Sequence, residues 1–141
     1  MDIVFVCTGN TCRSPLAESI AKSLSNNHTF SSRGIFATDG IPASRHTKQI
    51  IEENNLSPAT LSAAFQAEDS EKDLILTMTS SHRDTIRSLY PRSNVYTLTE
   101  YVNGTTRDIP DPYGGDYAIY YDTYIALHEN ITKLLTKIDK N

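Results

Sequence analysis

Hydrophobic positions along the chain alternate between short apolar runs and segments with helical spacing. Residues 3–6 form a run without polar interruption, as in a strand that is buried on both faces of a sheet. Residues 74–78 have the same character, and weaker strand patterns lie at residues 28–32, ending at Gly34, and at residues 94–98. Because these runs alternate with helical patterns, the chain is predicted to form an α/β fold with a parallel sheet.

The first helix is predicted to follow a short loop at residues 8–11. Ser14 and Pro15 are typical of a helix start, with Ser14 as N-cap and Pro15 at the first helical position, where its missing N–H costs nothing. The side chains that should pack on the sheet recur every four residues and are Leu16, Ile20 and Leu24.

Three further segments have helical spacing. The first, at residues 44–54, has only a weak helical pattern. The second is predicted to end before Pro91, and the residues that recur on one side of it are Met78, His82, Ile86 and Leu89. The last helix has the clearest pattern, because apolar residues recur every three or four positions. Its core-facing residues are Tyr120, Tyr124, Leu127, Ile131, Leu134 and Ile138. Residues 102–115 are predicted to form a long loop, a usual location for functional residues.

Composition narrows the class of protein. With 141 residues, the chain is expected to form a single domain over residues 1–141. The hydrophobic fraction of 38% and the charged fraction of 21% exclude collagen-like, coiled-coil and wholly disordered chains. A net charge of -4 argues against nucleic acid or an anionic membrane as the main partner. Because neither a membrane span nor a signal peptide is recognisable, the expected location is the cytoplasm. The protein is also expected to be a monomer.

The cysteines and histidines give no framework for a disulfide-rich or zinc-bound fold. Cys7 and Cys12 lie five positions apart at the end of the first apolar run, so no disulfide framework spans the chain. A structural zinc site needs four clustered ligands, and no metal is predicted here. The histidines are scattered singly, and no Ser/His/Asp constellation can be argued from them. We expect them at the surface or partly packed: His28, His46, His82 and His128.

Residues 7–14, Cys-Thr-Gly-Asn-Thr-Cys-Arg-Ser, lie between a buried strand and a capped helix. A loop in this place can wrap its backbone N–H groups around a phosphate. It has neither the Gly-Lys-Ser/Thr of a nucleotide-binding P-loop nor the three glycines of a dinucleotide loop. The predicted phosphate-binding residues are Thr8, Gly9, Asn10, Thr11, Cys12, Arg13 and Ser14.

Cys7 and Arg13 have complementary chemistry at a phosphate. A thiolate at Cys7 can attack the phosphorus in line, while the planar guanidinium of Arg13 and the backbone amides hold the equatorial oxygens. A neighbouring guanidinium and a helix N-terminus both favour the thiolate form, which makes Cys7 a competent nucleophile. Ser14 can donate a hydrogen bond to the sulfur and improve it as a leaving group. The alternative is a buried, inert cysteine at a strand end.

A carboxylic acid is needed to protonate the leaving group and later to activate the water that breaks a cysteinyl-phosphate. Asp111 is the first candidate, because Pro112 and the glycines at 114 and 115 shape a loop that can hold it above the phosphate. Tyr113 can form a wall of the same pocket. Asp108 is the alternative, and either residue could instead be a turn-forming carboxylate.

These motifs together resemble the low-molecular-weight protein tyrosine phosphatase family over essentially the whole chain. The resemblance rests on residues 7–14, on the strand that ends at Met78, and on the sequence Asp-Pro-Tyr at residues 111–113. It implies a flavodoxin-like three-layer fold, with a four-stranded parallel sheet flanked by helices. It also implies that no metal or cofactor takes part and that the partners are phosphorylated proteins.

The resemblance assigns roles to individual residues. It implies Cys7 as nucleophile, Arg13 as phosphate clamp and Asp111 as general acid and then base. The residues that match Asn10 and Ser14 shape and tune the loop in that family. Cys12 matches a residue that can form a reversible disulfide with the nucleophile, which would shield Cys7 from further oxidation.

One loop position departs from the tyrosine-specific pattern, because Thr11 replaces an Ile or another bulky apolar residue. The loop sequence resembles the protein-arginine phosphatase branch of the family, found in Gram-positive bacteria. A threonine hydroxyl suits a planar, hydrogen-bonding guanidinium better than a phenol ring. Gly114 stands where the mammalian enzymes carry a second tyrosine, so the pocket has one aromatic surface fewer. The predicted specificity residues are Thr11 and Tyr113.

The leading hypothesis is a protein-arginine phosphatase that works through a cysteinyl-phosphate, and the alternative is a phosphotyrosine-protein phosphatase with the same chemistry. A thioredoxin-coupled arsenate reductase would need further cysteines near residues 80–90, where the chain has none. A flavin-binding module is compatible with the fold class but leaves the pairing of Cys7 with Arg13 unexplained. A catalytically silent phosphoprotein-binding domain would be expected to lack the nucleophile or the acid.

Overall fold

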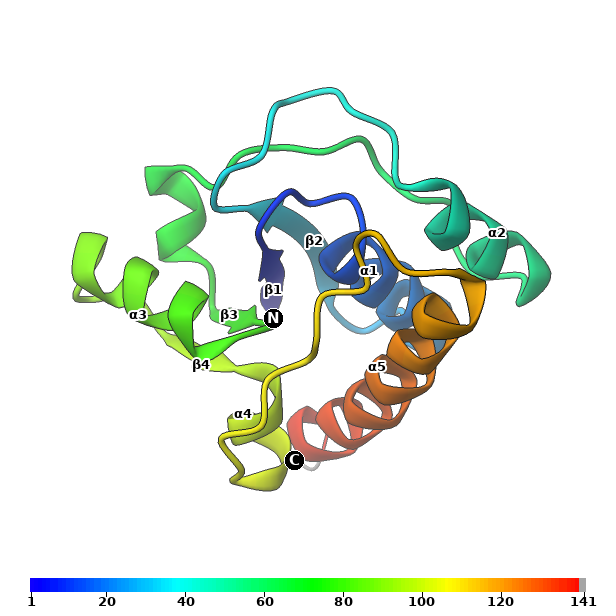
Figure 1. The fold of residues 1–141 in the computed structure, drawn as a ribbon. Coiled ribbons are helices and arrows are strands. Elements are labelled where there is room, and N and C mark those ends of the chain that lie inside the picture. The colour runs from blue at the N-terminus through cyan, green and yellow to red at the C-terminus, as the bar shows by residue number, and fades with distance from the viewer. Residues whose placement is uncertain (140–141) are drawn as a thin grey trace.

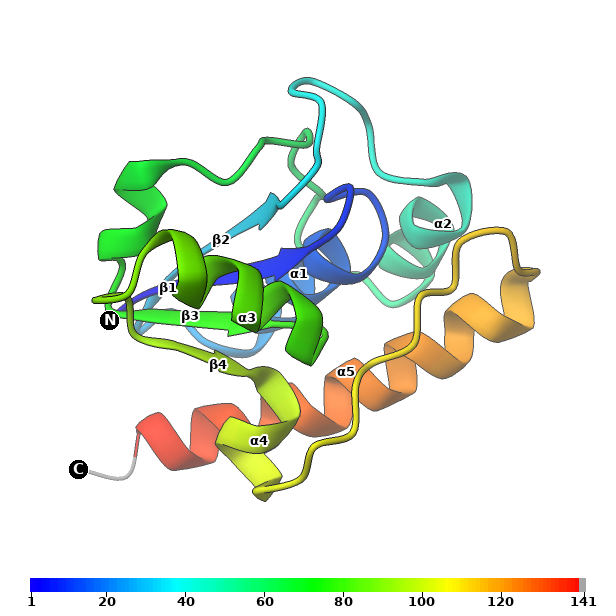
Figure 2. The same cartoon turned by 60° about the vertical axis from the view of Figure 1, so that its left-hand side comes forward.

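A computed structural model describes residues 1–139 of the chain and contains a four-stranded parallel sheet. The strands are β1 (Asp2–Cys7), β2 (Thr29–Gly34), β3 (Leu74–Thr77) and β4 (Val95–Thr97), in the spatial order β2-β1-β3-β4. The predicted parallel sheet is confirmed. Figure 2 shows β1, β2 and β3 pointing toward the same end of the molecule, so the loops that follow them gather at one edge.

Helices cover both faces of the sheet (Figure 1). Ile3 and Phe5 of β1 pack with α1 (Arg13–Leu24) and α5 (Tyr117–Ile138) on one face. Val4 and Val6 pack on the other face, with Ile86 of α3 (Ser80–Leu89). Because successive residues of a strand point to opposite faces, the uninterrupted apolar run of β1 supplies both cores. The three-layer arrangement is the one expected.

Two short helices and one helical turn complete the structure. Helix α2 (Arg45–Glu53) corresponds to the predicted segment at residues 44–54. The sequence pattern did not predict α4 (Leu98–Asn103) or the 3-10 turn at Ala67–Glu71. No helix in residues 1–139 is long and apolar enough to cross a membrane.

The predicted start of the first helix is wrong by two residues. Helix α1 begins at Arg13 with Cys12 as N-cap, and Pro15 is its third residue. A proline is tolerated there because the first-turn N–H groups of a helix have no partner within the helix. The Ser14 hydroxyl does not cap the helix but contacts the Cys7 sulfur. Leu24, predicted to pack on the sheet, is the last residue of the helix and is 47% exposed.

The structure also corrects the pattern around the third helix. Met78 is buried but precedes α3, and Leu89 at its end is 65% exposed. The fourth strand ends at Thr97, whose hydroxyl caps α4, so the long loop begins only at Gly104. Gly104 has a φ of 68°, a left-handed conformation that favours glycine and ends α4.

The predicted stripe of α5 is confirmed. It lies buried along the core from Tyr120 to Leu134, and Ile138 packs against the same core while half-buried. The loop at residues 104–116 runs beside α5 and returns the chain to the edge of the sheet where β1 ends (Figures 1 and 2). The loop after β1 and the loop before α5 therefore meet, although about one hundred residues separate them.

Candidate active site

The loop after β1 has a fixed shape, and Asn10 is its central support. Asn10 is buried and has a φ of 58°, in the left-handed region that asparagine tolerates better than most residues. Its Nδ2 donates to Ser14 Oγ at 2.8 Å, and its Oδ1 accepts from the backbone N–H of Ala63 at 2.9 Å. Asn10 therefore holds the loop from behind through both ends of its amide.

The end of β2 lies directly against this loop. Gly34 pairs with Cys7 in the sheet, and the backbone N–H of Phe36 donates to the carbonyl of Thr8 at 2.9 Å. A Cβ on Gly34 would lie 2.6 Å from the Thr8 carbonyl oxygen and 2.9 Å from the Asn10 nitrogen. Only a glycine fits here without displacing the loop.

Cys7 is buried at the end of β1, and its sulfur has a polar neighbour. Sγ lies 2.9 Å from Ser14 Oγ, which also accepts the hydrogen bond from Asn10. The carbonyl of Arg33 lies 3.3 Å from the same hydroxyl, so the sulfur at 2.9 Å is the nearer acceptor, and a thiolate there can take the Ser14 hydrogen. Asn10 and Ser14 lie behind the pocket and line no part of its wall.

Arg13 is 3% exposed, and two neutral acceptors hold its guanidinium. Nη1 donates to the carbonyl of Ile109 at 3.0 Å, and Nη2 donates to Thr8 Oγ1 at 3.4 Å. Nη2 also lies 3.6 Å from Asp111 Oδ2. The Nε–H is buried and has no hydrogen-bond partner within residues 1–139. A buried cationic donor without a partner is costly unless an anion meets it.

The two candidate acids lie in different surroundings. Asp111 is about half exposed, with Oδ2 facing Arg13 and Oδ1 accepting from the backbone N–H of Tyr113 at 3.0 Å. Asp108 instead accepts from the backbone N–H of Ser80 at 2.9 Å, at the start of α3. Asp111 lines the pocket and Asp108 does not.

Most of the residues predicted from the sequence meet in one pocket of about 260 Å³. Its walls are formed by Cys7, Thr8, Gly9, Thr11, Cys12, Arg13, Asp111 and Tyr113. The Tyr113 side chain is 81% exposed and stands at the rim. Within residues 1–139, no group of three or more His, Cys, Asp or Glu side chains could hold a metal ion.

Cys12 forms the side of the pocket nearest to α5. Both cysteines are free and buried. Cys12 Sγ lies 3.5 Å from Tyr120 Oη and 3.6 Å from Ser44 Oγ. Burial, followed by the hydrogen bond with Cys12, raises the pKa of Tyr120 to about 12. Tyr120 is therefore a neutral phenol at physiological pH.

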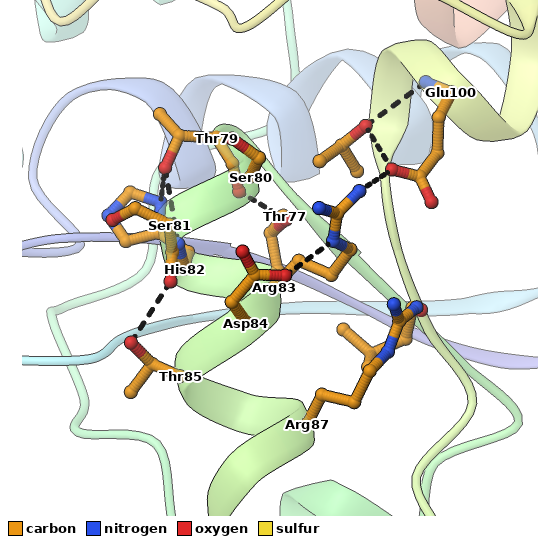
Figure 3. Close-up of polar contacts among 12 residues, drawn as sticks. Thr77, Thr79, Ser80, Ser81, His82, Arg83, Asp84, Thr85, Arg87 and Glu100 are labelled. Carbon is orange, nitrogen blue, oxygen red and sulfur yellow. Dashed lines mark hydrogen bonds and ion pairs between the residues drawn. The ribbon is translucent and has the colours of Figure 1, made fainter. Parts of the chain in front are cut away.

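His82 is a site residue that the sequence analysis did not find. We expected the histidines at the surface or partly packed, but His82 is 7% exposed. Its Nε2 lies 2.9 Å from Thr8 Oγ1, and its Nδ1 lies 2.9 Å from Thr79 Oγ1 (Figure 3 shows the contact with Thr79). Burial and, second, the positive charge of Arg13 lower the pKa of His82 to about 4. The only signal in the sequence was its place on the helix that follows a buried strand.

The lowered pKa of His82 makes a pH-dependent contribution to stability. Between pH 6.5 and about 4 the unfolded chain binds a proton that the folded chain does not. The free energy of unfolding therefore decreases as the pH is lowered from 6.5 to about 4. Relative to His82→Gln, which cannot titrate, the wild type should lose on the order of 2 kcal/mol, a value reduced because the ring is hydrogen-bonded to the exposed Thr8, where solvent screens its charge. Urea unfolding of both proteins at the two ends of the window measures this, and parallel pH profiles would contradict it.

Residues 2–141 match the model of the family described as low molecular weight phosphotyrosine protein phosphatase. The chain belongs to this family. It is 47% identical over 138 residues to the low molecular weight protein-tyrosine-phosphatase PtpB of Staphylococcus epidermidis, covering 97% of this chain and 99% of that protein. The resemblance inferred from the loop and the Asp-Pro-Tyr sequence is thereby confirmed.

Some solved structures of the same fold are described as arginine phosphatases and not as tyrosine phosphatases. The YwlE arginine phosphatase of Geobacillus stearothermophilus superposes with a TM-score of 0.95 at 35% identity, covering 99% of this chain and 93% of that chain. A YwlE arginine phosphatase in which serine replaces cysteine, with the active-site serine phosphorylated, superposes with a TM-score of 0.96 at 37% identity, covering 100% and 97%. The chain is thus a cysteine-dependent protein phosphatase of the low-molecular-weight family, and phosphoproteins are its class of substrate.

Proposed function

We propose that this low-molecular-weight phosphatase removes phosphate from phosphoarginine in proteins. The observation that carries the proposal is the wall of the pocket at Thr11, which places a small hydroxyl-bearing side chain beside Cys7 and Arg13. The arginine phosphatases among the solved structures of this fold support the same substrate. In the proposed reaction the pocket needs no cofactor, because its own side chains supply a nucleophile, a cation and a carboxyl group.

In the first step, the Cys7 thiolate attacks phosphorus and forms the S–P bond as the P–N bond to the substrate guanidine breaks. Asp111 gives its proton to the departing nitrogen, so that a neutral group leaves. The free Nε–H of Arg13 and the backbone N–H groups of the loop hold the equatorial oxygens. The neighbour with a phosphorylated serine in place of cysteine supports phosphoryl transfer to this position.

In the second step, Asp111 acts as a base. It takes a proton from water as the water oxygen attacks phosphorus, the S–P bond breaks, and inorganic phosphate leaves. The electron pair of the S–P bond returns to Cys7, where the hydrogen bond from Ser14 stabilises the thiolate. The position of Asp111 within the pocket, with Asp108 tied to α3, supports Asp111 as the acid.

The substrate preference is assigned to two side chains at the rim. The Thr11 hydroxyl can hydrogen-bond a guanidinium, and Tyr113 can cover its planar face. Gly114 has a φ of 83°, a left-handed conformation that disfavours the second tyrosine found in the mammalian enzymes. A phosphotyrosine substrate is the alternative, favoured by the names of the curated relatives and by the exposed Tyr113 ring, which can flank a phenol.

The deciding experiment compares kcat/KM for a phosphoarginine peptide and for the phosphotyrosine peptide of otherwise identical sequence. An excess of about 100-fold for phosphoarginine is expected, the discrimination that a polar wall can provide. A preference for phosphotyrosine would retain the chemistry and replace the substrate. Folded, reduced protein without activity on either peptide would contradict both.

The substitution Thr11→Ile is expected to move the preference toward phosphotyrosine. A larger apolar side chain removes the hydroxyl that a guanidinium would use and narrows the pocket, so the ratio of the two kcat/KM values should change by about tenfold or more. Thr11→Val is the matched control, since it removes the hydroxyl while keeping the size. If neither substitution changes the ratio, Thr11 does not select the substrate.

Two further properties are proposed with this function. Cys7 and Cys12 are buried, free thiols of one pocket, which supports a reversible disulfide between them under oxidation and a reducing location such as the cytoplasm.

A further inference from the structure

We propose that His82 is a positioning residue that fixes the Thr8 hydroxyl and, through it, the guanidinium of Arg13. The inference rests on the proposed role of Arg13 as the group that holds the phosphate. It adds to the site a side chain from α3, an element that contributes nothing to the pocket wall itself.

The imidazole is held firmly on the side of α3. Thr79, the N-cap of this helix, accepts from the backbone N–H of His82 at 3.3 Å, and its hydroxyl lies 2.9 Å from Nδ1 of the ring. Figure 3 shows His82 and Thr79 together at the start of the helix. Arg83 on the next position pairs with Glu100 of α4, which anchors α3 to its neighbour. The ring therefore has a rigid base.

On its other side, the ring holds a residue of the phosphate loop. Nε2 lies 2.9 Å from Thr8 Oγ1, and the same oxygen accepts from Arg13 Nη2 at 3.4 Å. Thr8 itself is exposed toward the pocket, and its hydroxyl oxygen has no other hydrogen-bond partner within residues 1–139. Without His82, the Thr8 side chain would be free to rotate and Arg13 would lose one of its two neutral anchors.

The charge state of the ring suits this role. The charged groups that face His82 are Arg13 from α1 and Asp108 and Asp111 from the loop before α5. Burial and Arg13 outweigh the two carboxylates and lower the pKa of His82, so the ring is neutral at physiological pH. A neutral imidazole offers one donor and one acceptor, which two threonine hydroxyls can match. A protonated ring would add a second cation beside Arg13 and oppose it.

A purely structural role would act through the contact between His82 and Thr79, at the start of α3. The two nitrogens allow the two roles to be separated. In His82→Gln, the terminal amide reaches the position of Nε2 and can still meet Thr8. In His82→Asn, the amide reaches only the position of Nδ1 and can meet Thr79. His82→Phe fills the space without either hydrogen bond.

The experiment measures kcat and KM for p-nitrophenyl phosphate, the inhibition constant of inorganic phosphate, and thermal unfolding for all three variants. We expect His82→Asn and His82→Phe to lose about tenfold in kcat/KM and to bind phosphate correspondingly more weakly, the factor typical of one hydrogen bond, and His82→Gln to stay within about threefold of wild type. The proposal would be overturned if His82→Asn kept the kcat/KM and phosphate affinity of the wild type while His82→Gln lost them. Unchanged phosphate inhibition in a destabilised His82→Phe would also overturn it.

A double-mutant cycle tests the path through Thr8. Thr8→Val removes the hydroxyl at nearly constant size, and in that background His82→Phe should have almost no further effect on phosphate binding. Additive effects would show that His82 acts elsewhere. Should wild-type protein turn over neither the phosphoarginine peptide nor p-nitrophenyl phosphate, the proposed function fails, and direct titration with inorganic phosphate still decides whether His82 supports the anion site.

Discussion

Replacing Cys7 by serine is expected to lower turnover by about 10⁵-fold or more, the scale seen when a covalent catalyst loses its nucleophile. A serine hydroxyl is a far weaker nucleophile than a thiolate and a poorer leaving group from phosphorus. The backbone N–H groups and Arg13 stay in place, so the pocket should still bind inorganic phosphate. Steady-state kinetics on either peptide, together with calorimetric titration of phosphate, measure the two effects.

The Cys7→Ser variant has a second expected outcome, which concerns the phosphorylated intermediate. Any phosphoryl group that reaches the serine at position 7 should remain there, because an alkoxide leaves phosphorus much more slowly than a thiolate. Intact-protein mass spectrometry after incubation with substrate detects this adduct, and thermal unfolding serves as the control for folding. Turnover close to that of the wild type would exclude Cys7 as the nucleophile.

The substitution Asp111→Asn is expected to reduce kcat by about 10²- to 10⁴-fold with a much smaller effect on substrate binding, the range of general acid catalysis. An amide can keep the hydrogen bond with the backbone of Tyr113 but has no acidic proton to transfer to the departing nitrogen. The loss should be smaller for p-nitrophenyl phosphate, whose leaving group needs less help from an acid. Comparing kcat for both substrates measures this difference.

Asp108→Asn is the matched control, because it makes the same chemical change on the same loop. Asp108 accepts from the backbone N–H of Ser80 and does not line the pocket, so its loss should affect stability more than kcat. A reduction below about tenfold is expected. If Asp108→Asn has the larger effect on kcat, the acid is Asp108, and Asp111 serves only to orient Arg13.

The spacing of hydrophobic residues predicted the strands and helices in which the buried positions are also the apolar ones. The strand at residues 3–6 is apolar throughout, and the buried side of α5 is apolar except at Thr123 and Asn130. Helix α4 was missed because it has only six residues and follows β4 without a break. Its start depends on the Thr97 cap and its end on Gly104, neither of which a hydrophobic pattern records.

The loop chemistry was predictable for a different reason, since residues 7–14 are contiguous and their order reflects the geometry of an anion site. Ser14 was assigned to the wrong local role because serine before proline is typical of a helix start, whereas its hydroxyl is used by Cys7 and Asn10. His82 could not be found in this way. It reaches Thr8 across a gap of 74 residues in sequence, and only the pairing of β3 with β1 brings the two together.

The arrangement of side chains around the pocket has a consequence for evolution. Asn10 and Ser14 support the loop from inside the protein, and Gly34 leaves no space for change beside them. Thr11 and Tyr113, in contrast, stand at the wall and rim, where a substitution disturbs no buried contact of that support. If Thr11 and Tyr113 select the substrate as proposed, lineages of this family can exchange one phosphorylated residue for another by a few substitutions at the wall and rim, while the phosphoryl-transfer machinery is inherited unchanged.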